Sequence, residues 1–185
     1  AVRFFNTKNR RNGILVLPTG AGNSLVIADI ASKLTGNVLV FQPSKEILEQ
    51  NFAKLKSYGV DDCSIYSASF NSKEISRITF ATIGSVISHS SDFNHFRYII
   101  IDECHTCNAT GGMYRDFFDC AERKILGLTA TPYRLNASRI SLDENGRYDP
   151  EKEPTNKCIL KFLTRTRPRI FHDVIYQVGI QTLLA

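Results

Sequence analysis

The chain has 185 residues, of which 43% are hydrophobic and 22% charged, and this ordinary globular composition excludes a chain that is disordered throughout. No run approaches the roughly 18 consecutive apolar residues of a membrane-spanning helix, so we expect no membrane partner. Lys and Arg outnumber Asp and Glu by 23 to 18. The resulting net charge of +5 fits a polyanionic partner such as nucleic acid, and it fits a merely basic protein equally well.

The five cysteines follow neither a disulfide pattern nor a zinc pattern. Their number is odd, their spacing is irregular, and no secretory signal is visible in the first residues. These features favour reduced thiols and a cytoplasmic location. Cys104 and Cys107 form a C-x-x-C pair, but a structural zinc ion needs two further ligands. Since the sequence offers no second pair, we expect no metal there.

Short apolar runs alternate with amphipathic stretches along the first two thirds of the chain. The apolar runs are continuous, which is typical of strands covered on both faces, and they span residues 13–17, 37–41, 78–82, 98–101 and 124–128. Helical patterns cover residues 25–34, 47–58 and 113–121, and Ser44 is placed to cap the second helix. This order predicts an α/β fold with a mainly parallel sheet and helices on both faces.

The pattern changes after Leu135, so we expect the first domain to span residues 1–135. Residues 136–157 are polar and contain two prolines, which predicts a loop or an insertion. Residues 158–162 and 170–178 have strand-like composition. We expect residues 158–185 to complete the domain and to lead toward another one, with a helix beginning near Leu183.

Three arginines alternate with Thr166 and Pro168 between those two strand-like segments. The alternation could place their guanidinium groups on one side of the chain, although a solvated basic loop is the preferred interpretation over a phosphate contact. The three are Arg165, Arg167 and Arg169.

A glycine-rich segment connects the first predicted strand directly to the first long helix. Glycines let the backbone approach phosphate oxygens, and N–H groups at a helix N-terminus attract anions. Ser24 would place its hydroxyl on a Mg²⁺ ion. The segment resembles a Walker A motif, although a tight turn without any ligand is the alternative. The predicted phosphate-binding residues are Thr19, Gly20, Ala21, Gly22, Asn23 and Ser24.

Asn23 departs from the Walker A pattern because the residue before Ser24 should be lysine. That lysine contacts the β- and γ-phosphates and neutralises charge during phosphoryl transfer. Asparagine is shorter and neutral, so it donates a hydrogen bond but supplies no charge. Losing a charge-assisted contact of this kind weakens binding by about 1.5–3 kcal/mol. Both an engineered substitution and a natural inactivated variant would explain Asn23.

Two acidic residues follow the buried run at 98–101. The carboxyl ends of parallel strands are where ligand crevices of α/β sheets open, which places Asp102 and Glu103 at such a crevice. Asp102 suits a water-mediated contact with Mg²⁺, and Glu103 suits a general base that orients a water molecule. The alternative is an acid pair that simply faces solvent.

A hydroxyl-rich turn follows the last predicted strand. Thr129 and Thr131 can form hydrogen bonds with neighbouring side chains, and His105 is the natural partner. An ordinary turn ending at Pro132 is the alternative.

These segments together resemble the first RecA-like lobe of superfamily 2 helicases and translocases. Residues 102–105 resemble the DEAD/DEAH box in its D-E-C-H form, and residues 129–131 resemble the T-A-T motif that couples hydrolysis to movement. The amino-acid sequences of residues 15–22, 102–105 and 126–135 most resemble those of RadD-type DNA-repair helicases. Type I and type III restriction motor subunits are near relatives of that family. The resemblance covers about residues 13–135.

The resemblance also implies a nucleic-acid interface. Residues 43–50 resemble the P-T-R-x-L-x-x-Q element, which holds the nucleic-acid backbone through a helix N-terminus, and residues 81–86 resemble the next backbone-contacting motif. DNA is the expected partner, through contacts that do not depend on sequence. The predicted contact residues are Pro43, Ser44, Lys45, Gln50, Thr82, Gly84 and Ser85.

The resemblance therefore implies ATP and Mg²⁺ as cofactors and a role in ATP-driven movement on DNA, with repair as the expected process. It also implies a second RecA-like lobe as partner, since ATP is hydrolysed between two lobes. Neither that lobe nor the adenine-recognising element upstream of the phosphate loop is found in the sequence, so the chain alone is expected to be inactive.

Two alternatives remain open at this point. One is a DNA-binding or scaffolding module whose phosphate loop has degenerated, which Asn23 supports and the intact acid pair opposes. The other is a small P-loop kinase or GTPase, which the absence of an N-K-x-D element disfavours. Binding of a magnesium-bound nucleotide would separate the leading interpretation from the first alternative.

Overall fold

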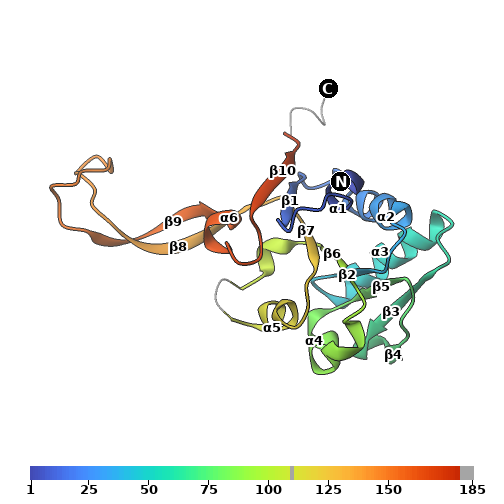
Figure 1. Ribbon diagram of the computed structural model, residues 1–185. Helices are drawn as coiled ribbons and strands as arrows, with labels where there is room; N and C mark the ends of the chain where they lie inside the picture. The colour runs from blue at the N-terminus through green and yellow to red at the C-terminus, as the bar shows by residue number, and fades with distance from the viewer. Residues whose placement is uncertain (109–110, 180–185) are drawn as a thin grey trace.

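The computed structural model describes residues 1–108 and 111–179, and these form one layered α/β lobe with a projecting arm (Figure 1). The main sheet has the spatial order β10-β1-β7-β6-β2-β5-β3-β4. All its strand pairs are parallel except β3–β4. Its strands are β1 (Gly13–Val16), β2 (Val38–Phe41), β3 (Cys63–Ser67), β4 (Ser72–Lys73), β5 (Ile78–Ala81), β6 (Tyr98–Ile101), β7 (Lys124–Thr129) and β10 (Asp173–Gln177).

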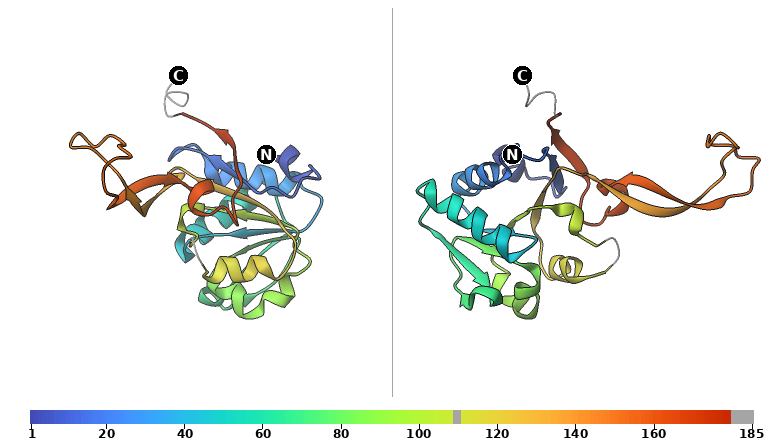
Figure 2. Two further views of the ribbon diagram at one scale, coloured as in Figure 1. Left: turned by 60° about the vertical axis from the view of Figure 1, so that its left-hand side comes forward. Right: turned by 180° about the vertical axis from the view of Figure 1, so that it is seen from behind.

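Helices cover both faces of this sheet, as Figure 2 shows from two sides. One face carries α1 (Val2–Phe5), α2 (Asn23–Lys33) and α3 (Lys45–Ser57). The other carries α4 (Ile83–Val86) and α5 (Met113–Asp119), together with the 3-10 segment η2 (Ile87–Phe93). The predicted mainly parallel α/β fold is therefore confirmed.

The burial of the strands explains why their apolar runs are continuous. In β1, Ile14 packs in the cluster beneath α5, while its neighbour Leu15 packs in the cluster beneath α2 and α3. Successive strand residues point to opposite faces, so a strand between two helical layers needs apolar residues at every position. No helix among residues 1–108 and 111–179 is long and apolar enough to cross a membrane.

Ser44 caps α3 as its position in the sequence predicts. Its backbone is extended, and its Oγ accepts a hydrogen bond from the backbone N–H of Ile47 at 3.4 Å. An N-cap side chain satisfies a backbone donor that would otherwise lack a partner in the first turn.

Replacing Ser44 with alanine is expected to lower the free energy of unfolding by about 1 kcal/mol, because the cap is lost. Ser44→Asp keeps an acceptor at the same place and should remain close to the present chain. Urea denaturation followed by circular dichroism measures both changes. An unchanged midpoint for Ser44→Ala would show that the cap contributes nothing to stability.

Residues 136–157, predicted as a loop or an insertion, are in part regular structure, which corrects the loop alternative. Strands β8 (Tyr133–Ile140) and β9 (Thr155–Phe162) pair in antiparallel fashion along their whole length and form the projecting arm in Figure 1. Both prolines lie outside the paired strands, in the connection at the tip. The strand expected at 158–162 is confirmed as the second half of β9.

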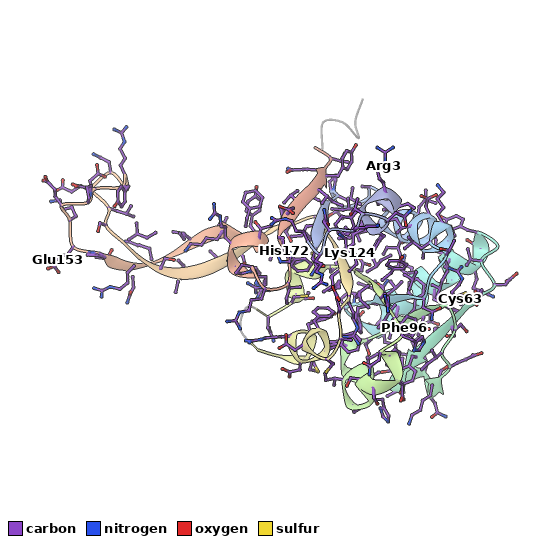
Figure 3. The ribbon with its side chains drawn as sticks, viewed as in Figure 1. Arg3, Cys63, Phe96, Lys124, Glu153 and His172 are labelled. Atoms are coloured by element: carbon purple, nitrogen blue, oxygen red, sulfur yellow. The ribbon has the colours of Figure 1, made fainter. Side chains whose placement is uncertain are left out.

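The two ends of the arm differ in the chemistry of their side chains. Its stem carries apolar side chains that remain in contact with solvent, and Leu135 and Leu160, which face each other across the pair, are 69% and 66% exposed. The connection over residues 141–154 contains five acidic residues against two basic ones. Glu153 marks this far end in Figure 3.

The expectation that three arginines form a solvated loop is wrong for Arg167. A short helix, α6 (Leu163–Thr166), replaces the expected extended segment and turns Arg167 into the protein. This side chain is only 5% exposed, and its Nε donates a hydrogen bond to the carbonyl oxygen of Cys107. The helix expected near Leu183 falls outside the described residues.

Candidate functional site

The glycine-rich loop leaves the carboxyl end of β1 and enters α2 through two glycines with positive φ. Gly20 has φ of 85°, and Gly22, the N-cap of α2, has φ of 81°. A hydrogen bond from the N–H of Ala21 to the carbonyl oxygen of Pro18 closes the loop. Thr19, Gly20 and Gly22 are exposed. A side chain at either glycine would force strained backbone, so the sequence provides the residue that this turn requires.

Asn23 is the first residue of α2, and its side chain is not well satisfied. Its Oδ1 is buried, and it has no hydrogen-bond partner among the residues that the structure describes. A buried acceptor without a partner is unfavourable. The position therefore offers a carbonyl oxygen where the Walker A pattern has an ammonium group.

Asp102 lies at the carboxyl end of β6 and is only 4% exposed. Its Oδ1 accepts a hydrogen bond from the N–H of Glu103, and its Oδ2 accepts one from Nδ2 of Asn51, both at 3.0 Å. Burial and then the charge of Glu103 raise the pKa of this carboxyl group from 3.8 to about 6. Among the described residues no basic side chain forms an ion pair with it. A buried carboxylate of this kind suits a cation as its partner.

Ser24 and Asp102 are joined through Asn51, a residue that the sequence analysis missed. Oγ of Ser24 donates to Oδ1 of Asn51 at 2.7 Å, and Nδ2 of Asn51 also donates to Oε1 of Gln42 at 2.9 Å. Asn51 and Gln42 are 5% and 1% exposed. A signal existed for Asn51, since it lies three residues after Leu48 and four before Leu55, on the buried face of α3. Gln42 follows a buried strand directly, which is a second usable signal.

Glu103, His105 and Thr129 form a second polar group beside Asp102. Nδ1 of His105 lies 2.9 Å from Oγ1 of Thr129 and 3.2 Å from Oε2 of Glu103. Thr129 also accepts from the N–H of Thr131 at 3.1 Å. The predicted contact between His105 and the threonine pair is thus confirmed for Thr129, whereas Thr131 takes part through its backbone.

Glu103 adopts a left-handed backbone conformation, with φ of 48° and ψ of 49°. This conformation is strained for a residue other than glycine by about 1–2 kcal/mol. Residues held in such conformations cluster at functional sites, where the surrounding structure enforces them. Here the left-handed conformation of Glu103 turns the chain sharply after the buried Asp102, and Glu103 itself is half-buried.

Several predicted nucleic-acid contacts surround one cavity of about 380 Å³. Pro43, Thr82 and Gly84 line it together with Gln42 and Thr106, which follow β2 and the acidic motif. The hydroxyl groups of Thr82 and Ser85 lie 3.0 Å apart, and Ser85 accepts from the N–H of Ala68. The structure therefore brings the two predicted backbone-contacting segments to a common hollow.

The remaining predicted contacts lie outside that cavity. Ser44 caps α3, and the ammonium group of Lys45 lies 4.9 Å from the ring centre of Phe70. Gln50 is exposed on α3. None of these three side chains lines the cavity, although Ser44 and Lys45 directly follow Pro43, which does.

A magnesium-bound nucleotide fits most of the residues at the carboxyl ends of β1 and β6. The loop offers exposed backbone at Gly20 and Gly22, and Ser24 and Asp102 offer oxygen ligands of the kind that Mg²⁺ prefers. Asn23 is the one member that does not fit. In contrast, the described residues contain no cluster of three or more His, Cys, Asp or Glu able to hold a metal by itself.

The cysteines are all free, and the C-x-x-C pair belongs to the core. Cys104 and Cys107 are fully buried beneath the sheet, and burial raises the pKa of both thiols, that of Cys107 to about 12. Both therefore remain protonated at neutral pH and act as small apolar side chains.

A parallel sheet, a glycine-rich loop after β1 and an acidic pair after β6 define a P-loop domain with the RecA-like architecture of superfamily 2 helicases. Residues 1–134 match the family described as "Type III restriction enzyme, res subunit". The chain belongs to this family.

Curated relatives share this region. The chain is 32% identical over 126 residues to the DNA 3'-5' translocase XPB2 of Sulfurisphaera tokodaii, a match that covers 67% of the chain and 28% of that protein. It is 28% identical over 158 residues to the general transcription and DNA repair factor IIH helicase/translocase subunit XPB of Danio rerio, covering 76% of the chain and 20% of that protein. The matches thus span less than a third of either relative.

Solved structures show the same fold at low identity. The crystal structure of UvsW from bacteriophage T4 superposes with a TM-score of 0.62 and 17% identity, covering 91% of the chain and 32% of the UvsW chain. The helicase domain of Hef from Pyrococcus furiosus superposes with a TM-score of 0.59 and 18% identity, covering 91% and 35%.

Proposed function

We propose that the chain is the first, nucleotide-binding lobe of an ATP-dependent DNA helicase or translocase, and that the parent protein acts in DNA repair. The observation that carries this proposal is the joined polar site at the carboxyl ends of β1 and β6. There Ser24 connects through Asn51 to the buried Asp102, and Glu103 lies beside His105 and Thr129. The similarity to the two XPB proteins supports the part that concerns DNA.

In this function the loop residues from Thr19 to Ser24 would hold the nucleotide phosphates, and Ser24 and Asp102 would hold Mg²⁺. Bound Mg²⁺ neutralises charge on the phosphates. Glu103 would accept a proton from the water whose oxygen bonds to the γ-phosphorus, while the bond from that phosphorus to the β,γ-bridging oxygen breaks and ADP leaves. His105, with Thr129, would keep the Glu103 carboxylate in place. Thr131, together with His105 and Thr129, would then couple the hydrolysis of the nucleotide to movement of a second lobe.

We further propose that turnover requires a second RecA-like lobe of the same full-length protein, and that the chain alone is inactive. Asn23 adds to this inactivity by leaving the phosphates without a lysine. A RadD-type helicase remains the specific form that we propose for the parent. The five free thiols support a reducing compartment such as the cytoplasm.

A second candidate is a DNA-binding module that no longer uses nucleotide. The specific observation in its favour is the orphaned Oδ1 of Asn23 at the point where a Walker A lysine belongs. The two candidates share the DNA surface and differ in whether Mg²⁺ and ATP bind at all.

Replacing Lys45 with alanine is expected to weaken DNA binding to a similar extent for every sequence, because Lys45 is the one cation among the seven predicted contacts. The slope of log affinity against log salt should fall by about 0.7 for single strands and 0.9 for duplex. Fluorescence anisotropy with labelled oligonucleotides over a salt series measures both quantities.

Lys54→Ala is the matched control, since this exposed lysine lies in the last turn of the same helix, away from the cavity. It should leave the salt slope unchanged. Equal losses for both variants would mean that general positive charge, rather than the surface near Pro43 and Thr82, attracts DNA.

A further inference from the structure

A continuous chain of buried hydrogen bonds runs from the 380 Å³ cavity to the candidate nucleotide site. Gln42 lines the cavity, and its Oε1 accepts from Asn51 at 2.9 Å. Asn51 contacts Asp102 at 3.0 Å and Ser24 at 2.7 Å. Two side-chain amides thus separate the residues proposed to hold a nucleic-acid backbone from those proposed to hold Mg²⁺.

The cavity end of this chain is incomplete. Nε2 of Gln42 is buried and has no hydrogen-bond partner within the described part of the chain. A buried donor without an acceptor is unfavourable, so a ligand oxygen that reached Nε2 from the cavity would be stabilised. Phosphate and sugar oxygens are acceptors of this kind, and the cavity also carries the hydroxyl groups of Thr82 and Thr106.

The orientation of the Gln42 amide bears on the orientation of the Asn51 amide. Oε1 of Gln42 and Oδ2 of Asp102 both accept from Nδ2 of Asn51, while Oδ1 of Asn51 accepts from Ser24. The opposite orientation of Asn51 would place its oxygen against both of these acceptors, so a Gln42 that presents Oε1 favours the present orientation. A ligand oxygen that bound Nε2 of Gln42 would hold Gln42 in this arrangement, and Asn51, Ser24 and Asp102 with it.

We propose that Gln42 and Asn51 are positioning residues that couple occupation of the cavity by a nucleic-acid backbone to the placement of Ser24 and Asp102 around a magnesium-bound nucleotide. The proposal rests on the proposed nucleotide-binding function. It assigns a role to two residues that contact neither reacting atoms nor the phosphates. Both amides have short, buried contacts, so their arrangement is discrete rather than loose.

The test is a measurement of thermodynamic coupling. The dissociation constant of Mg·ADP is measured by calorimetry with and without saturating oligo-dT, in the present chain and in Asn23→Lys, and the ratio of the two constants is the coupling factor. Allosteric coupling commonly changes affinity by about 5-fold or more. These two chains are the parents of the variants in this test. We expect a factor of that size in each of them and a factor of about 1 after Asn51→Leu or Gln42→Leu.

Ala53→Leu is the matched control, because it introduces the same side chain at an exposed position of α3. Ala53 lies outside the relay, which comprises the contacts from Gln42 through Asn51 to Ser24 and Asp102. It should keep the coupling factor of the parent. A role in stability alone would change the melting temperature of Asn51→Leu and leave the ratio intact. If Asn51→Leu fails to fold, Gln42→Leu decides the question, because it breaks the chain of contacts at the cavity and leaves Asn51 with Ser24 and Asp102.

The outcomes separate the relay from the proposed function. A retained coupling factor in the variants, or its absence in a parent that binds both ligands, would overturn the relay and leave the function standing. No binding of Mg·ADP by either background would overturn the nucleotide function and the relay with it. Loss of coupling in both relay variants and its retention in Ala53→Leu would support the proposal.

Discussion

Replacing Asn23 with lysine is expected to raise the affinity of the chain for Mg·ATP roughly 10- to 100-fold. A charge-assisted contact contributes about 1.5–3 kcal/mol, and each 1.4 kcal/mol is a factor of ten in affinity. The backbone at this position suits a Walker A lysine, since Asn23 is the first residue of α2 and directly follows the left-handed Gly22. A lysine there also removes the buried Oδ1 that lacks a partner.

Titration calorimetry of Mg·ATP into both chains at one salt concentration measures the effect. Asn23→Gln is the matched control, because it lengthens the side chain and stays neutral. We expect it to remain as weak as the present chain. An equal gain for glutamine and lysine would show that length rather than charge limits binding. Absence of binding in all three chains would favour the DNA-binding module that no longer uses nucleotide.

The parts of the fold that the sequence predicts well are those fixed by local patterns. The five apolar runs became β1, β2, β5, β6 and β7, because strands between two helical layers are apolar at every position. The cap at Ser44 was also predictable, since capping depends on a few neighbouring residues. The acidic pair was placed correctly because strand ends in a parallel sheet meet at one edge.

The pairing of β8 with β9 and the burial of Arg167 could not be predicted from local sequence patterns. Strands β8 and β9 pair with each other along eight residues, and the only part of this pair that the sequence pattern indicates is residues 158–162. The pairing brings Tyr133 against Phe162, 29 residues away in the chain. Arg167 is buried because α6 turns it toward the carbonyl group of Cys107, 60 residues away in the chain. Contacts between distant segments decide both features.

The sequence names candidate residues of the site but not the contacts that join them. Sequence motifs identify Ser24 and Asp102 as separate groups, but the structure joins them through Asn51 and extends the network to Gln42. Neither amide belongs to a motif that names its role. Their positions next to buried neighbours were the available signal, and a polar residue at such a position indicates a buried network.

Replacing Asp102 with asparagine is expected to stabilise the nucleotide-free chain above pH 6. Burial and the charge of Glu103 raise the pKa of Asp102 from 3.8 to about 6, so folding favours its protonated form. The stability that this preference contributes is fully present below pH 3.8 and is lost as the pH rises through 6. At pH 8 the folded chain therefore carries a poorly solvated charge that asparagine does not have.

The gain at pH 8 should be about 2 kcal/mol, somewhat below the full value of the shift, because one pKa unit corresponds to about 1.4 kcal/mol and the amide replaces an acceptor. The network can adapt, since a turn of the Asn51 amide offers its oxygen to the new side chain. Urea denaturation at several pH values between 4 and 8 measures the difference in free energy of unfolding between the two chains.

The difference should vanish near pH 4, where the carboxyl group is protonated in the folded chain and resembles the amide. Asp92→Asn provides the control, because this carboxylate is exposed and its removal should change little at any pH. A difference that stays constant between pH 4 and 8 would mean that packing or hydrogen bonding, and not the buried charge, sets the stability at this position. A stabilising Asp102→Asn confined to the higher pH values would instead identify Asp102 as a carboxylate retained at the expense of stability, as expected for a residue that serves a bound cation.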